Sequence, residues 1–218
     1  MVSEVMNANF QYTEEPKNKK EFTEKFDKSY TRIAGIYNLF AKYFPIWKTW
    51  ITRAIPHIRG PRVLEVSFGT GYLLTRYADK FETHGIDYNE KMLSIAKKNL
   101  ENQSIKANLV QGNVESLPYE DEFFDSIINT MAFSGYPDGE KALTEMIRTL
   151  KNGGRLIMID VNYPSNGNWM GMKMAKFWSA AGDIIRDMDS LLNEFNLEYE
   201  KREIGGSGSV HLYVIKKN

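Results

Sequence analysis

A chain of 218 residues is long enough for one α/β domain with a substantial core, and we expect a single domain. Its 28 Lys and Arg residues balance its 28 Asp and Glu residues, so net charge gives no reason to expect nucleic acid or an anionic membrane as a partner. The absence of cysteine excludes disulfides and thiolate chemistry. No apolar run reaches the length of a membrane span and the N-terminus does not resemble a signal peptide, so we expect a cytoplasmic protein.

Residues 1–18 are polar and unpatterned, and we expect them to be flexible. From residue 19, apolar residues recur every three or four positions, which predicts a helix with one aromatic stripe. The stripe consists of Phe22, Phe26, Tyr30, Ile33, Tyr37 and Phe40. Pro45 interrupts the pattern, and a second helix is expected over residues 46–54. The two helices either belong to the core or cover the open end of a sheet and help to form an acceptor pocket.

Residues 62–74, RVLEVSFGTGYLL, combine a strand, a tight turn and the start of a helix. Val63, Leu64 and Val66 have the apolar, β-branched character of a buried parallel strand. Gly69 and Gly71 follow as loop residues that allow a ligand to approach the backbone. The helix N-terminus after this loop would favour a negatively charged ligand group.

The spacing Glu65-x-Ser67-x-Gly69-x-Gly71 resembles the first motif, E/D-x-G-x-G-x-G, of class I S-adenosylmethionine (SAM)-dependent methyltransferases. A nicotinamide fingerprint would require glycine at position 74, where this chain has leucine. Ser67 replaces the first glycine of the motif, and the turn is workable if Ser67 has a negative φ. A glycine turn in another doubly wound domain is the alternative. The resemblance implies that these four residues and Thr70 contact the cofactor.

Asp87 ends the second expected strand, 16 residues after Gly71. In nucleotide-binding α/β folds an acid at this point accepts hydrogen bonds from both ribose hydroxyls. Tyr88 is expected against the adenine face. After a third strand at residues 107–110, Asn113 and Val114 stand where the family commonly has an acid and an apolar residue that recognise adenine. Asn113 can still accept one hydrogen bond, although an ordinary turn asparagine is the alternative.

The fourth strand is expected within residues 122–133 and ends in Asn129, Thr130 and Met131. Ligands of open α/β sheets bind outside the carboxyl ends of the strands, so we expect these three residues near the methionine part of SAM and its transferable methyl group. The string is not the N/D-P-P-Y of amide and nucleobase amino methyltransferases, which argues against nucleobase amino groups as acceptors.

The second half of the chain continues the same pattern. A helix beginning at Asp138 stops at residues 151–154, and the run LKNGGRLIMID resembles the L-K-P-G-G-x-L entry to the fifth strand of the family. Residues 163–182 form an insert that either helps to build the acceptor site or simply packs as a helix. A helix over residues 183–195 and a hairpin of strands 197–204 and 210–215 follow.

The resemblance implies an α/β fold with a doubly wound, seven-stranded, mostly parallel sheet of order 3-2-1-4-5-7-6, an antiparallel last strand and an N-terminal helical cap. Residues 19–218 would form one domain. Its parts are the cap (19–58), the cofactor-binding core (61–162), the acceptor-site insert (163–182) and the C-terminal helix and hairpin (183–218). FDKSYTRIAGIYNLF resembles the entry segment of the ubiquinone and menaquinone biosynthesis methyltransferases, although Asn38 replaces its aspartate, and Tyr37 would be a lid contact to the cofactor.

The expected function is SAM-dependent methyl transfer to a small hydrophobic or amphiphilic acceptor by in-line displacement, with S-adenosylhomocysteine (SAH) as product. Two alternatives are a SAM-binding regulatory protein without catalysis and, less favoured, a nicotinamide-dependent oxidoreductase. No general base is assigned, because His57, His84 and His211 are better explained as structural, and Tyr37 and Tyr136 are weaker candidates. No cluster has metal-ligand spacing, and the oligomeric state stays open.

Overall fold

The computed structural model describes residues 10–43 and 46–218, with the side chains of residue 30 and residues 33–43 excluded. The strands are β1 (Arg62–Val66), β2 (Glu82–Asp87), β3 (Asn108–Gln111), β4 (Phe124–Thr130), β5 (Leu150–Val161), β6 (Glu198–Gly205) and β7 (Val210–Lys216). The α-helices are α2 (Lys19–Tyr43), α3 (Ile46–Ile51), α4 (Leu74–Tyr77), α5 (Glu90–Glu101), α6 (Gly139–Thr149), α7 (Trp169–Ala181) and α8 (Met188–Glu194). Short 3-10 helices are η2 (Thr52–His57), η3 (Ala78–Lys80), η4 (Phe133–Gly135) and η5 (Gly206–Gly208).

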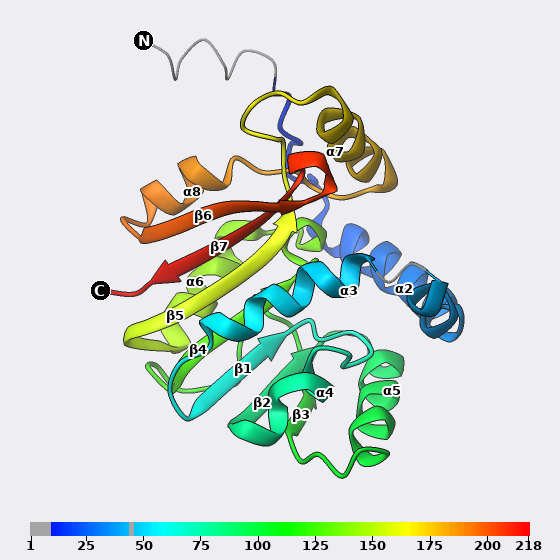
Figure 1. The fold of residues 1–218 in the computed structure, drawn as a ribbon, viewed down its shortest axis with the longest axis vertical. Helices are drawn as coiled ribbons and strands as arrows, with labels where there is room; N and C mark the ends of the chain where they lie inside the picture. Colours follow the sequence, from blue (N-terminus) through cyan, green and yellow to red (C-terminus); the bar gives the residue numbers. More distant parts are fainter. Residues whose placement is uncertain (1–9, 44–45) are drawn as a thin grey trace.

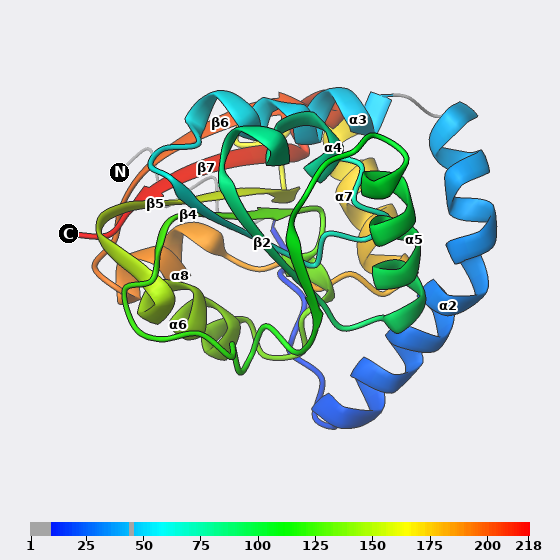
Figure 2. The same cartoon turned by 90° about the horizontal axis from the view of Figure 1, so that it is seen from below.

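The seven strands form one sheet of order β3-β2-β1-β4-β5-β7-β6, and β7 runs antiparallel to both of its neighbours. This confirms the expected fold class and strand order. The sheet lies between two helical layers (Figures 1 and 2), with α3, α4 and α5 packed on one face and α6 and α8 on the other. Because both faces are covered, the central strands are apolar on both sides, as in other parallel sheets.

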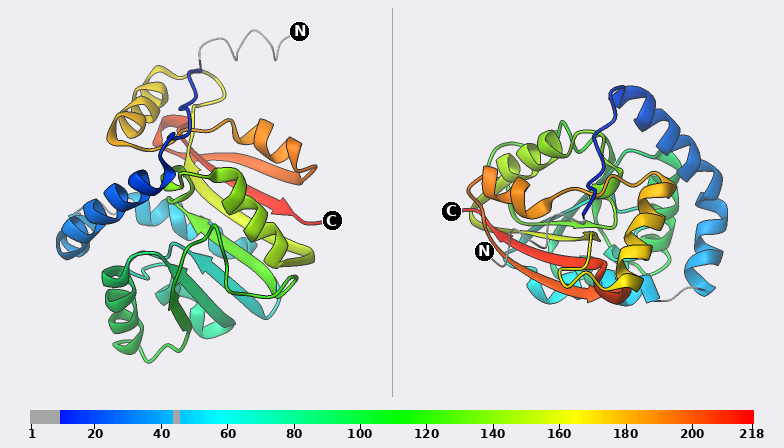
Figure 3. Two further views of the ribbon diagram at one scale, coloured as in Figure 1. Left: turned by 180° about the vertical axis from the view of Figure 1, so that it is seen from behind. Right: turned by 90° about the horizontal axis from the view of Figure 1, so that it is seen from above.

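Helix α2 lies outside the carboxyl ends of the parallel strands (Figures 1 and 3) and is joined to the start of α5. The Asn89 side chain donates a hydrogen bond of 2.7 Å to the Asp27 carboxylate, and Lys91 donates one of 3.1 Å to the Thr31 carbonyl. The helix is therefore fastened next to the strand ends where ligands of this architecture bind.

The segment before α2 is also part of the packed structure. We expected residues 1–18 to be flexible; residues 1–9 lie outside the described residues, whereas residues 10–18 contact the second half of the chain. Phe10 stacks on Tyr163 with ring centroids 5.3 Å apart, the Thr13 N–H donates to the Ile185 carbonyl, and Glu15 pairs with Arg186 at 3.1 Å. Residues 10–18 are therefore packed against the loop after β5 and the segment between α7 and α8.

Two expected helices are shorter in the structure. The helix after the glycine loop is reduced to the four residues of α4, and the helix expected over residues 183–195 is confined to α8. Gly182 ends α7 with φ +114°, and the Ile184 N–H bonds the distant Ser134 carbonyl. Because long-range partners take these backbone groups, the segment before α8 is not helical.

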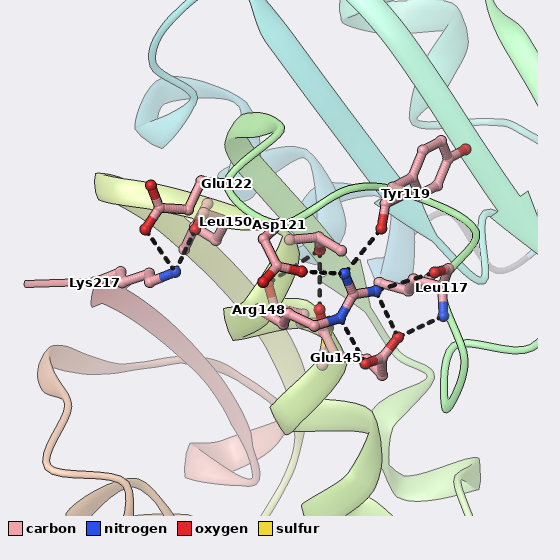
Figure 4. A network of polar contacts seen from close by, with 10 residues as sticks. Leu117, Tyr119, Asp121, Glu122, Glu145, Arg148, Leu150 and Lys217 are labelled. Carbon is pink, nitrogen blue, oxygen red and sulfur yellow. Dashed lines mark hydrogen bonds and ion pairs between the residues drawn. The ribbon is translucent and has the colours of Figure 1, made fainter.

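Arg148 at the end of α6 holds the segment that leads into β4, as Figure 4 shows. Its guanidinium donates to Glu145, to Asp121 and to the carbonyls of Leu117 and Tyr119 at 2.7–3.1 Å. These charge-assisted bonds fix the chain between β3 and β4. The same segment contains Asn113 and Val114.

Candidate functional site

A pocket of about 1180 Å³, measured out to its open mouth, lies at the carboxyl ends of β1, β2 and β4. Most of the residues predicted from the sequence line it, namely Glu65, Ser67, Gly69, Thr70, Asp87, Tyr88, Asn113, Val114, Thr130 and Met131. Gly71 and Asn129 lie behind this lining, and the side chain of Tyr37 lies outside the described residues. Its lining combines apolar side chains with a few polar groups, as is usual for small-molecule sites.

Asp87 is fixed by two backbone donors at the end of β2. Its two carboxylate oxygens accept hydrogen bonds from the Gly69 N–H at 2.8 Å and the Asn89 N–H at 2.9 Å. Burial nevertheless raises the pKa of this carboxyl to about 6, so it is ionised at neutral pH. A carboxylate has about four acceptor positions, so each oxygen retains one for a ligand hydroxyl.

The glycine loop is open toward the pocket at Gly69. This residue has φ +55°, and a Cβ built on it would meet no atom within 4 Å. Gly71 has φ +73°, and its Cβ would lie 2.9 Å from the Ala96 Cβ, so it permits close packing of α5 behind the loop. Helix α4 has only four residues, so its dipole is too short for the anion site that was expected at its N-terminus.

Ser67 adopts the left-handed conformation, with φ +54°. The sequence analysis expected a negative φ at this position, and that expectation is wrong. A side chain in this conformation costs about 1–3 kcal/mol and needs support from its surroundings. That support comes from Tyr136, whose hydroxyl lies 2.7 Å from the Ser67 hydroxyl.

Tyr136 connects Ser67 to Asn129. The Asn129 side-chain NH₂ donates to the Tyr136 hydroxyl oxygen at 2.7 Å, and either hydroxyl can donate in the contact between Tyr136 and Ser67. Tyr136 was a weak candidate base in the sequence analysis, but burial raises the pKa of Tyr136, so a hydrogen-bonding role fits better.

We expect Tyr136→Phe to lower the free energy of unfolding by about 1–3 kcal/mol, because Ser67 and the Asn129 NH₂ both lose a buried partner. Thermal and denaturant unfolding measure this loss. Tyr119→Phe is the matched control, since the Tyr119 hydroxyl is buried without a protein partner among the described residues. Equal destabilisation by the two substitutions would mean that the Ser67–Tyr136–Asn129 contacts contribute nothing.

Glu65 lies in β1 beneath the glycine loop and is 2% exposed. Its carboxylate accepts a hydrogen bond of 3.0 Å from the Tyr77 hydroxyl, and burial raises its pKa to about 8. The protein environment therefore holds this carboxyl mostly neutral at pH 7. A cationic ligand group beside it would favour the ionised form and would in turn be attracted by it.

The three residues that were expected to face adenine, Tyr88, Asn113 and Val114, all line the pocket. Tyr88 is 45% exposed at the rim, and Val114 is buried in the wall. The Asn113 amide oxygen accepts a hydrogen bond of 3.0 Å from the Glu115 N–H, so it serves its own turn and keeps one lone pair for a ligand. On the opposite side Met131 has φ +53°, a second strained residue in the pocket wall.

The pocket is also lined by residues that sequence patterns did not mark as site residues. They are Thr23 and Phe26 of α2, Trp47 and Ile51 of α3, and Tyr72. The aromatic stripes gave the only signal, because they required a surface to cover. Most of these side chains are apolar, and they line the same pocket as Asp87 and the glycine loop.

The ionisable lining residues are acids and tyrosines. The carboxylates are those of Asp27, Glu65, Asp87 and Glu115, and no histidine is among the described lining residues. His211, for example, is 1% exposed and bonds the Gly208 carbonyl through its ring nitrogen. Within residues 10–43 and 46–218 no group of three His, Asp or Glu side chains could hold a metal ion, and no helix is long and apolar enough to cross a membrane.

Comparison with known proteins identifies the family. The model of the ubiE/COQ5 methyltransferase family matches residues 12–197. The ubiquinone/menaquinone biosynthesis C-methyltransferase of Edwardsiella ictaluri is 34% identical over 143 residues, which are 61% of this chain and 57% of that protein. Its counterpart in Francisella philomiragia is 31% identical over 182 residues, 75% of this chain and 69% of that protein. The chain thus spans about half to two thirds of the length of these relatives.

A solved SAM-dependent methyltransferase from Thermotoga maritima has the same fold, with a TM-score of 0.65 and 21% identity. The match covers 85% of this chain and 98% of that one. The glycine loop, the acid at the end of β2 and the antiparallel β7 therefore occur together in a chain whose sequence and fold agree with one family. On these grounds, the chain belongs to the ubiE/COQ5 methyltransferase family, whose cofactor is SAM.

Proposed function

We propose that this chain transfers the methyl group of SAM to a small hydrophobic or amphiphilic acceptor. The observation that carries the proposal is that one pocket is lined both by Asp87 and the glycine loop, where we place the nucleoside of SAM, and by apolar side chains such as Phe26 and Trp47. The relatives named above act, by their names, in quinone biosynthesis, which agrees with an acceptor of this kind.

The residues present fit the cofactor. Asp87 retains an acceptor position on each oxygen for the ribose diol, and the open side of Gly69 admits a ligand against the backbone. Tyr88 and Val114 would lie against the adenine, with Asn113 as a hydrogen-bond acceptor. Ser67, Thr130 and Met131 would lie at the methionine part, where Glu65 would face the ammonium group.

The bound cofactor supplies an already activated methyl group, so the protein chiefly has to orient an acceptor and exclude water. Orientation of two reactants can contribute about 7–11 kcal/mol to the lowering of a barrier. The apolar side chains of Phe26, Trp47 and Ile51 would align an apolar acceptor and displace water from it. With no histidine in the described lining, the site best suits a nucleophile that does not need a strong base.

The competing proposal is a SAM-binding regulatory protein without catalysis. Ser67 in place of glycine and Asn113 in place of the usual acid are the features in its favour. The Ser67 hydroxyl, however, is hydrogen-bonded to Tyr136, and the Asn113 amide oxygen keeps one lone pair for a ligand. Neither replacement therefore removes a function that the pocket needs.

The test has two stages, so that binding and catalysis can fail separately. Calorimetric titration with SAM and SAH should give binding of both. Radiolabelled SAM is then incubated with apolar and amphiphilic phenols, quinols and amines, and label is counted in the organic extract. We expect transfer to at least one of them, and Phe26→Ala should reduce that transfer while leaving SAH binding within about two-fold, because it removes apolar area from the pocket lining. SAH binding without transfer to any acceptor would support the regulatory alternative.

A further inference from the structure

Helix α7 has its bulky apolar side chains on the outside. Trp169 and Phe177 are each 65% exposed and Met170 is 50% exposed, so this helix carries three of the six large exposed apolar side chains in the described part of the chain. The fully buried residues of the helix are Gly171 and Ala175, and Met172, Met174 and Trp178 beside them are half-buried. An ordinary surface helix has polar residues on its outer side, where α7 has large apolar ones.

The small residues on the inner side are required by close packing. A Cβ on Gly171 would lie 2.4 Å from the Ser207 carbonyl oxygen and 2.9 Å from Pro164. The helix backbone therefore rests directly on η5 and on the loop after β5, at the end of the molecule where Figure 1 places α7. Met172 and Trp178 of α7 also pack against Val161, Tyr163 and Ile185, so the inner side is held by apolar contacts. The large apolar side chains on the outer side make no such contact with the core and remain to be explained.

The outer side is basic as well as apolar. Lys173 and Lys176 are exposed on the same side, and the Lys173 ammonium lies 4.8 Å from the centre of the Trp169 ring. The helix contains no acidic residue. The nearest acid in sequence, Asp183, bonds Ser134, and Glu203, which lies beside Gly208 under the helix, accepts a hydrogen bond from the Ser165 N–H. The balanced charge of the whole chain thus conceals a local positive patch.

We propose that the outer side of α7, formed by Trp169, Met170, Lys173, Lys176 and Phe177, binds the surface of an anionic lipid bilayer. Trp favours the headgroup region, Phe and Met can enter the acyl boundary, and Lys is attracted by anionic lipid. A second copy of the chain fits less well, because pairing this side with itself would bring the lysines of both copies together.

Helix α7 ends next to the pocket. Gly182, which follows the helix, lies against Phe26, and Phe26 lines the pocket. A bilayer bound along α7 would therefore lie beside Phe26, where an amphiphilic molecule could enter the pocket. The docking itself does not depend on the proposed methyl transfer.

The test is co-sedimentation of the full chain with vesicles of phosphatidylcholine alone or mixed with phosphatidylglycerol. We expect binding to the mixed vesicles, weakening with added salt, and little binding to phosphatidylcholine. Trp169→Ser with Phe177→Ser, and separately Lys173→Glu with Lys176→Glu, should each weaken binding at least about ten-fold.

Matched controls place the same chemical changes elsewhere. Lys97→Glu with Lys98→Glu alters two exposed lysines of α5, and Val110→Ser alters an exposed apolar residue of β3. Both should bind vesicles as the wild type does. Wild-type protein that stays in the supernatant with anionic vesicles would overturn the proposal, as would equal loss in the α7 and control variants. A dimer in light scattering that Trp169→Ser with Phe177→Ser dissociates, without vesicle binding by the wild type, would assign this surface to self-association instead.

Discussion

Asp87→Ala is expected to weaken the binding of SAM and SAH by about 100-fold or more. The substitution removes the two acceptor positions proposed for the ribose hydroxyls, and each hydrogen bond to a charged group contributes about 1.5–3 kcal/mol. It also releases the Gly69 N–H, so the glycine loop loses the contact that fixes it to the end of β2. Isothermal titration calorimetry with SAH measures the change without turnover.

The control for Asp87→Ala is Asp79→Ala, which removes an exposed acid from η3 and should leave SAH affinity unchanged. Circular dichroism establishes that both variants are folded. Because burial raises the pKa of Asp87 to about 6, wild-type affinity should also fall as pH decreases through 6, where the carboxyl becomes protonated and loses acceptor strength. A folded Asp87→Ala protein that binds SAH like the wild type would remove Asp87 from the site.

Short-range patterns in the sequence were sufficient to predict the frame of the site. The apolar run of β1, the glycines after it and the acid at the end of β2 are close in sequence, and their relation follows from one strand–loop–helix unit. The strand order came with the family resemblance, and the order in the structure confirms it. Once the order is known, the carboxyl ends of β1, β2 and β4 must meet at one edge of the sheet.

The supporting contacts were not predictable, because they join residues with no fixed spacing. Ser67 and Tyr136 are 69 positions apart, and nothing near Ser67 indicates that a distant hydroxyl supports its positive φ. The same applies to Asn89, which caps α5 by accepting a hydrogen bond from the Met92 N–H. Its NH₂ group also holds Asp27 of α2, a contact that only the tertiary structure reveals.

Asp183→Asn is expected to stabilise the protein at neutral pH by about 1–3 kcal/mol, since it relieves a conflict between two carboxyl groups. The Ser134 hydroxyl oxygen lies 2.9 Å from Asp160 and 2.8 Å from Asp183, but it has only one proton to donate. Asp160 also accepts hydrogen bonds from the backbone N–H groups of Ser134 and Val161, which favour its ionised form. The second contact is therefore favourable only when Asp183 is protonated.

Burial, and then the charge of Asp160, raises the pKa of Asp183 from 3.8 to about 6. A raised carboxyl pKa means that the folded state binds the proton more tightly than the unfolded state. Its contribution to stability is therefore fully present below pH 3.8 and is lost as pH rises through 6. Asparagine removes the charge and donates permanently to Ser134, so the gain over wild type should be greatest above pH 6 and should disappear toward pH 4.

Denaturant unfolding of both proteins across this pH range measures the difference, and Glu120→Gln, which neutralises an exposed acid before β4, should give a nearly constant offset. A gain that is the same at pH 4 and pH 7.5 would show that packing, rather than the shared proton, distinguishes the amide from the acid. A loss at both pH values would mean that the Asp183 carboxylate is needed ionised, which would contradict the assignment of the proton to this residue.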